Sequence, residues 1–138
     1  MSDKDLRIQS SKETDFRTRI VHLILSGNPE KALELLSKHY AVHTPELRVG
    51  TVKRHRKVLG CYVEKEERIY VSKSEYLNSP FVVLHEFYHH LRSSQMTRGK
   101  QAEKRANSFA SDYLEDFRRT YLALSLRRLK TDSSSCGA

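Results

Sequence analysis

The run HEFYH at positions 85–89 combines two histidines and a glutamate at a spacing that suits metal chemistry. His85 and His89 are four residues apart, so on an α-helix both imidazoles project from one face and can bind a single ion. Glu86 lies one position further round, where its carboxylate can reach a metal-bound water without binding the metal. The run therefore predicts one zinc ion per chain, with Glu86 as the general base.

A catalytic zinc ion normally has three protein ligands and an open position for water, so two histidines are incomplete. Glu103 is the predicted third ligand, because it follows a short turn after His89 and begins a helix that could fold back against the first. Asn107 shares a face with Glu103 and could hydrogen-bond a ligand histidine, fixing its tautomer. Asp112 and Glu115 are the alternatives, two to three turns further along the helix.

The remaining histidines are not expected to bind the metal. His90 follows His89 directly, so its side chain points about 100° away around the helix, and we expect it near solvent. The donor that would stabilise an oxyanion is left open between Tyr88, His90 and Tyr113. Four histidines without ligand spacing are expected in surface or hydrogen-bonded positions: His22, His39, His43 and His55.

The elements that would position this site follow from apolar spacing. Helical spacing of apolar residues over 16–25 and 29–40 predicts two opening helices, the second with Asn28 as N-cap and proline at its first position. A β-rich stretch over 45–72 follows. The HEFYH helix begins at Pro80, and a long final helix begins at Lys100. The predicted fold class is α+β.

The β-rich stretch is interpreted as three strands. The polar string at 64–67 would connect an antiparallel pair tightly, and the basic cluster at 53–57 would form the preceding loop. Together with the helices, this predicts a small three-stranded sheet beside the HEFYH helix.

Length and composition favour one domain. With 138 residues and 38% apolar residues, the chain can build one modest core, which we place over residues 13–130. Residues 1–12 are expected to be a flexible arm and residues 131–138 a disordered tail. The polar start lacks a signal peptide's apolar segment and no stretch suits a membrane, so a cytoplasmic protein is expected. Cys61 and Cys136 are expected to be free thiols.

The net charge of +8 favours nucleic acid or an acidic protein as a partner. Lys53, Arg54, Arg56 and Lys57 are the candidate nucleic-acid-binding residues. An alternative function is therefore a basic nucleic-acid- or protein-binding module with a structural or degenerate zinc site. A sparser basic group lies near the C-terminus: Arg118, Arg119, Arg127, Arg128 and Lys130.

With HEFYH followed by the helix sequence EKRANSFA, the chain resembles the gluzincins, thermolysin-like zinc peptidases whose two-histidine helix is followed by a glutamate ligand on a second helix. It looks closest to the minigluzincins and to the ImmA/IrrE family of regulatory peptidases. The resemblance covers roughly residues 30–125. It differs from the SprT-like peptidases, because no histidine follows His90, and from larger gluzincins, because it has no C-terminal subdomain.

The resemblance implies a minimal zincin-like fold and a zinc-dependent endopeptidase. It implies His85, His89 and Glu103 as zinc ligands, Glu86 as the base and Asn107 as a support behind the ligands. The substrate would be a peptide or protein, with an intracellular regulatory protein as the implied target. The oligomeric state is left open.

Overall fold

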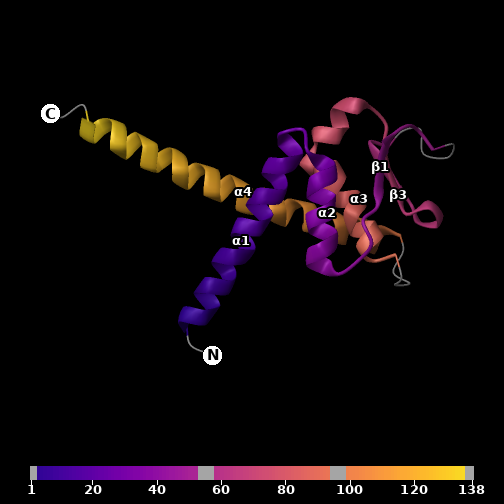
Figure 1. Ribbon diagram of the computed structural model, residues 1–138, viewed down its shortest axis with the longest axis horizontal. Helices are drawn as coiled ribbons and strands as arrows, with labels where there is room; N and C mark the ends of the chain where they lie inside the picture. Colours follow the sequence, from indigo (N-terminus) through magenta and orange to yellow (C-terminus); the bar gives the residue numbers. More distant parts are fainter. Residues whose placement is uncertain (1–2, 53–57, 94–98, 136–138) are drawn as a thin grey trace.

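The computed structural model describes residues 3–52, 58–93 and 99–135 and has the predicted α+β fold. Along the chain, helices precede and follow a short β-rich segment, and Figure 1 shows the strands at one side of the molecule beside α3. The elements are α1 (Asp3–Leu25), α2 (Pro29–Tyr40), β1 (Glu46–Val49), β2 (Gly60–Val63), η1 (Glu64–Glu66), β3 (Arg68–Val71), η2 (Ser74–Asn78), α3 (Pro80–Leu91) and α4 (Lys100–Ser135).

The three strands form one sheet in the order β1-β3-β2. β3 pairs in parallel with β1 and antiparallel with β2, and the short helix η1 with Glu67 in the left-handed conformation (φ 47°) joins β2 to β3. The predicted antiparallel pair with a tight polar connection is confirmed. Ile69 and Val71 of β3 are fully buried, whereas Arg68 and Tyr70 are only partly buried. This alternation is that of a strand with one face on a core.

α3 lies between the sheet and the other helices (Figure 1). Val83, Leu84 and Phe87 of α3 are fully buried in the core that α1 and α2 help to build. α4 crosses α3 with small residues, of which Ala106 and Ala110 are fully buried. Alanines four apart let two helix backbones approach closely, which brings the start of α4 against the pocket side of α3.

Both ends of the chain are helical further out than expected. The prediction of a flexible arm over residues 1–12 is wrong for residues 3–12, because α1 begins at Asp3. The prediction of a disordered tail over residues 131–138 is wrong for residues 131–135, because α4 ends at Ser135. The predicted domain limits of 13–130 are therefore too narrow at both ends. Apolar periodicity reports packing, whereas a helix can continue through residues without it if no glycine or proline intervenes. Residues 3–12 and 131–135 contain neither.

Candidate metal centre

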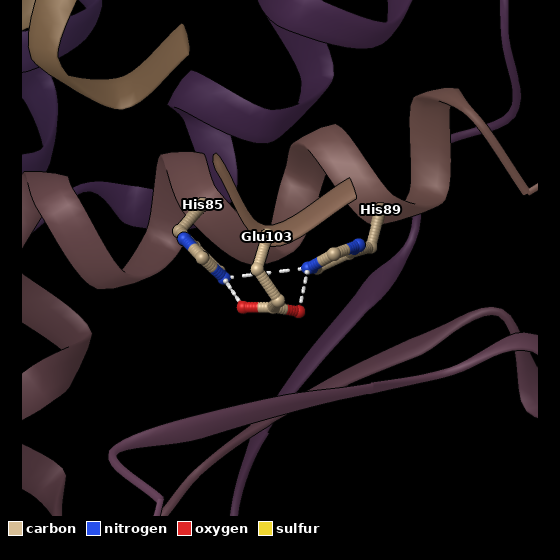
Figure 2. Close-up of side chains that lie close together, drawn as sticks. All are labelled: His85, His89 and Glu103. Carbon is tan, nitrogen blue, oxygen red and sulfur yellow. Dashed lines mark hydrogen bonds and ion pairs between the residues drawn. The ribbon is translucent and has the colours of Figure 1, made fainter. Parts of the chain in front are cut away.

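The HEFYH run lies in α3, whose start follows the predicted pattern. Ser79 is the N-cap and Pro80 takes the first helical position, where its missing N–H costs nothing. Apolar residues on the buried faces of α3 fix the rotation of the helix about its axis. As a result His85 and His89 share the side that faces the start of α4 (Figure 2).

Glu103 completes a three-residue cluster with the two histidines. One carboxylate oxygen lies 2.9 Å from His85 Nε2 and the other lies 2.9 Å from His89 Nε2. The two Nε2 atoms are 3.3 Å apart. Figure 2 shows both imidazoles extending from α3 toward the carboxylate, which reaches them from α4. The predicted ligand set of His85, His89 and Glu103 is thus brought together.

The cluster fits a divalent cation with nitrogen and oxygen ligands. Ligands about 2.0–2.1 Å from a tetrahedral zinc ion lie about 3.3–3.4 Å from one another, close to the separations observed among these three residues. Without a cation, each Nε2 must carry a proton to donate to Glu103. One cation would replace both protons and use all three lone pairs. The donor set could therefore hold a metal ion.

Burial favours the neutral form of His89. Loss of hydration lowers the pKa of His89, even though the Glu103 carboxylate acts in the opposite direction, and the neighbouring His85 adds to the lowering. Neutral imidazole is the form that binds metals. The side chains of His85 and His89 are 15% and 22% exposed, so the ligand atoms remain accessible from the pocket.

A pocket of about 630 Å³ opens beside the cluster, between α3, β2 and the start of α4. Glu86 contributes to its wall and is only 5% exposed. Burial, together with the smaller effect of the negative charge of Glu103, raises the pKa of Glu86 to about 8. No hydrogen bond from the described residues reaches the Glu86 carboxylate, so this group is open to a molecule in the pocket.

Gly60 of β2 makes the close contact between the sheet and the base. A Cβ atom at this position would lie 2.9 Å from Val82 Cγ1 and 3.1 Å from Glu86 Cγ. A larger residue would therefore push β2 away from α3. Gly60 was not among the site residues predicted from the sequence, although a glycine inside a strand pattern is a recognised sign of close backbone approach.

His90 is not near solvent, contrary to expectation. It is 5% exposed, its Nε2–H donates to the carbonyl oxygen of His43 (2.6 Å), and the Tyr62 hydroxyl donates to its Nδ1 (2.8 Å). The helical rotation from His89 to His90 is as expected, but that rotation leads into the protein, because α3 is covered on more than one side. With both ring nitrogens engaged, His90 has no lone pair for a metal.

Asn107 does not support the ligands as predicted. Its side chain is exposed, and within the described residues it makes no hydrogen bond to either histidine. His85 Nδ1 is buried and has no hydrogen-bond partner there. Asn107 lies four residues beyond Glu103, about 6 Å further along α4, so sharing a face with Glu103 does not by itself bring its side chain to the histidines.

The alternative ligands lie elsewhere. Asp112 and Glu115 are exposed further along α4, and Glu115 pairs with Arg119 (3.2 Å). Of the oxyanion candidates only Tyr88 lines the pocket, since Tyr113 is buried with its hydroxyl 2.6 Å from that of Tyr40. The candidate nucleic-acid-binding residues lie outside the described residues: Lys53, Arg54, Arg56 and Lys57.

The pocket wall includes side chains that sequence reasoning did not place there. Arg92 and Arg105 bring positive charge to it, and Cys61 contributes a thiol whose pKa is raised by burial and then by the charge of Glu86. These residues come from β2, the end of α3 and α4. No local motif joins them, so only the folded chain brings them together.

Comparisons of the chain with protein-family models, with curated proteins and with solved structures gave no match. The functional assignment therefore rests on the residues of the site. None of the helices in the described part of the chain has the length and apolar character needed to cross a lipid bilayer.

Proposed function

We propose that this chain is a zinc-dependent endopeptidase in which Glu86 is the general base. The observation that supports the proposal is the convergence of His85, His89 and Glu103 on one point of a pocket whose wall also contains Glu86. A metal site that serves only the fold is normally closed by a fourth protein ligand. Among the described residues the cluster has three candidate ligands, and it borders an open pocket, which supports a catalytic site.

Each part of the site would have one chemical task. The two histidines and Glu103 would hold the ion, which when bound would polarise a peptide carbonyl and increase the acidity of a water molecule. Glu86 would accept a proton from that water as the oxygen attacks the carbonyl carbon. The C–N bond then breaks, and Glu86 would return the proton to the leaving amine.

The sheet offers a way to orient an extended substrate. In the order β1-β3-β2, β2 pairs on one side only among the described strands, and Gly60, Cys61 and Tyr62 of β2 line the pocket. An unpaired strand edge can bind an extended peptide through main-chain hydrogen bonds. A peptide added to β2 would pass beside His85 and Glu86, which supports a peptide bond as the bond that is cut.

The test compares Glu86→Gln with the unaltered chain. Glutamine keeps the shape of the side chain but cannot accept the proton, so cleavage of a peptide library should fall about 10²- to 10⁴-fold while one zinc per chain is retained. Zinc content is measured by elemental analysis and cleavage by mass spectrometry. Glu30→Gln, on the exposed start of α2, is the matched control and should change neither quantity. Full cleavage by zinc-loaded Glu86→Gln would refute the proposed role of Glu86.

A further inference from the structure

The C-terminal part of α4 extends beyond the body of the protein. α4 is held to α1 by the Arg17–Asp116 ion pair (3.1 Å) and by the contact between the hydroxyls of Thr18 and Thr120 (3.2 Å). After Thr120 the helix continues to Ser135, and Figure 1 shows this part projecting away from the other elements. Residues 121–124 and 126–129 of this part are accordingly exposed.

Four leucines of the projecting helix are well exposed, and three of them lie on one face, with Leu124 on the opposite face. Leu122, Leu126 and Leu129, which we call the leucine strip, are 55%, 62% and 65% exposed. On the part of α4 that packs against the body, Ala110 and Tyr113 are 0% and 1% exposed. Apolar side chains that recur along one exposed face are characteristic of an interaction surface, because water contact with them is unfavourable.

The spacing of the leucine strip is that of a coiled-coil seam. The intervals of four and three residues are those between successive d, a and d positions of a heptad. At 100° per residue, the three side chains lie within an arc of about 60°, which is narrower than the face that packs on a globular core. A second helix is the structure that such a narrow seam accommodates. We propose that the leucine strip is a docking surface for a helix of an acidic protein partner.

The basic residues beside the leucine strip indicate that the partner helix is acidic. Arg118 is exposed and lies one turn before Leu122, at a heptad g position, where a charge selects the charge of the opposing helix. Between Asp116 and Asp132 the sequence contains basic residues and no acidic residue. A second copy of the strip would bring like charges together, which disfavours self-association. Nucleic acid would contact the arginines but leave the leucines in water.

The test uses the full chain and a synthetic peptide of three heptads with leucine at a and d and glutamate at e and g. We expect this acidic peptide to bind, and the same peptide with lysine at e and g to bind at least about tenfold more weakly. Replacing all three leucines of the strip by serine should weaken binding of the acidic peptide at least about tenfold. Fluorescence anisotropy measures each affinity, and circular dichroism shows that the variants are folded.

Two further variants separate the proposal from its alternatives. Leu124→Ser, which alters a 53% exposed leucine on the opposite face of the same helix, should leave the affinity unchanged. Arg118→Glu should weaken binding of the acidic peptide and strengthen binding of the basic one. The proposal is overturned if the peptides bind equally or if the leucine variants bind like the unaltered chain. It is also overturned if the leucines mediate a homodimer, or if duplex DNA or anionic vesicles bind through the strip and the acidic peptide does not.

Discussion

α3 presents histidines on two sides, and the two sides use them differently. On the pocket side, His85 and His89 direct Nε2 toward a carboxylate and toward each other. On the buried side, His90 gives one ring nitrogen to a backbone carbonyl and the other to Tyr62. His89 and His90 are sequence neighbours, yet only His89 directs a ring nitrogen toward His85 and Glu103. The capacity to bind a metal thus depends on the partners of the ring, and residue type alone does not decide it.

The largest expected effect lies on the pocket side. His85→Ala removes one of three candidate ligands, so the affinity for zinc should fall by more than about 100-fold, beyond the loss typical of an outer hydrogen-bond partner. Competition with a chromophoric chelator measures this affinity. His22→Ala, on the exposed side of α1, is the control and should bind zinc like the unaltered chain. Undiminished zinc affinity of His85→Ala would remove the distinction between the two sides of α3.

A substitution on the buried side of α3 should lower the stability of the protein and leave its zinc content unchanged. His90→Ala leaves a cavity and takes the hydrogen-bond partners from the His43 carbonyl and the Tyr62 hydroxyl, so the free energy of unfolding should fall by about 3 kcal/mol. Urea denaturation at a fixed zinc concentration measures the change. The zinc content of the folded protein should stay at one per chain. If His90→Ala lost zinc and kept its stability, His90 would belong to the metal centre.

The sequence predicted the pocket side of α3 better than its buried side. The spacing of His85 and His89 within one helix, and the fold-back that brings Glu103 to them, follow from helix geometry and a short connection. The burial of His90 depends on Tyr62 and His43, which lie 28 and 47 residues earlier in the chain. Such neighbours are set by the order of strands and the packing of helices, which no local spacing encodes.

The same division holds for the fold. The number of strands and the tight β2–β3 connection are local features and were predicted, whereas the parallel pairing of β1 with β3 joins segments far apart in the sequence. The length of α4 was underestimated because residues 131–135 show no apolar periodicity. The prediction that Asn107 hydrogen-bonds a ligand histidine was wrong for a related reason. Sharing a helix face with Glu103 gives direction, but contact also needs the right distance from α3.

A smaller effect is expected where the sheet meets the pocket side. Gly60→Ala would place a Cβ within 2.9 Å of Val82 and 3.1 Å of Glu86, forcing β2 and α3 apart and lowering the free energy of unfolding by about 1–3 kcal/mol. Gly50→Ala is the matched control, since the nearest atom to its Cβ is 3.6 Å away, in Tyr70. Thermal or urea denaturation compares the two variants. Equal stability of both would show that β2 can shift without strain.

The smallest expected effect tests whether the two sides of α3 are energetically separate. Tyr62→Phe removes only the hydroxyl that donates to His90 Nδ1, so the free energy of unfolding should fall by about 1 kcal/mol. Tyr121→Phe, with the ring 62% exposed and no hydrogen bond among the described residues, should have no effect. Zinc affinity should be unchanged in both variants, because neither residue belongs to the ligand cluster.

A double-mutant cycle then assigns the loss to the Tyr62–His90 contact. Once His90→Phe has removed the acceptor, Tyr62→Phe should destabilise the protein far less than it does in the unaltered chain, because the two substitutions break the same hydrogen bond. The coupling energy is the difference between these two losses in urea denaturation. Strictly additive losses would mean that the buried histidine is held by the His43 carbonyl and by packing alone. A coupling accompanied by altered zinc affinity would instead join the buried side of α3 to its pocket side.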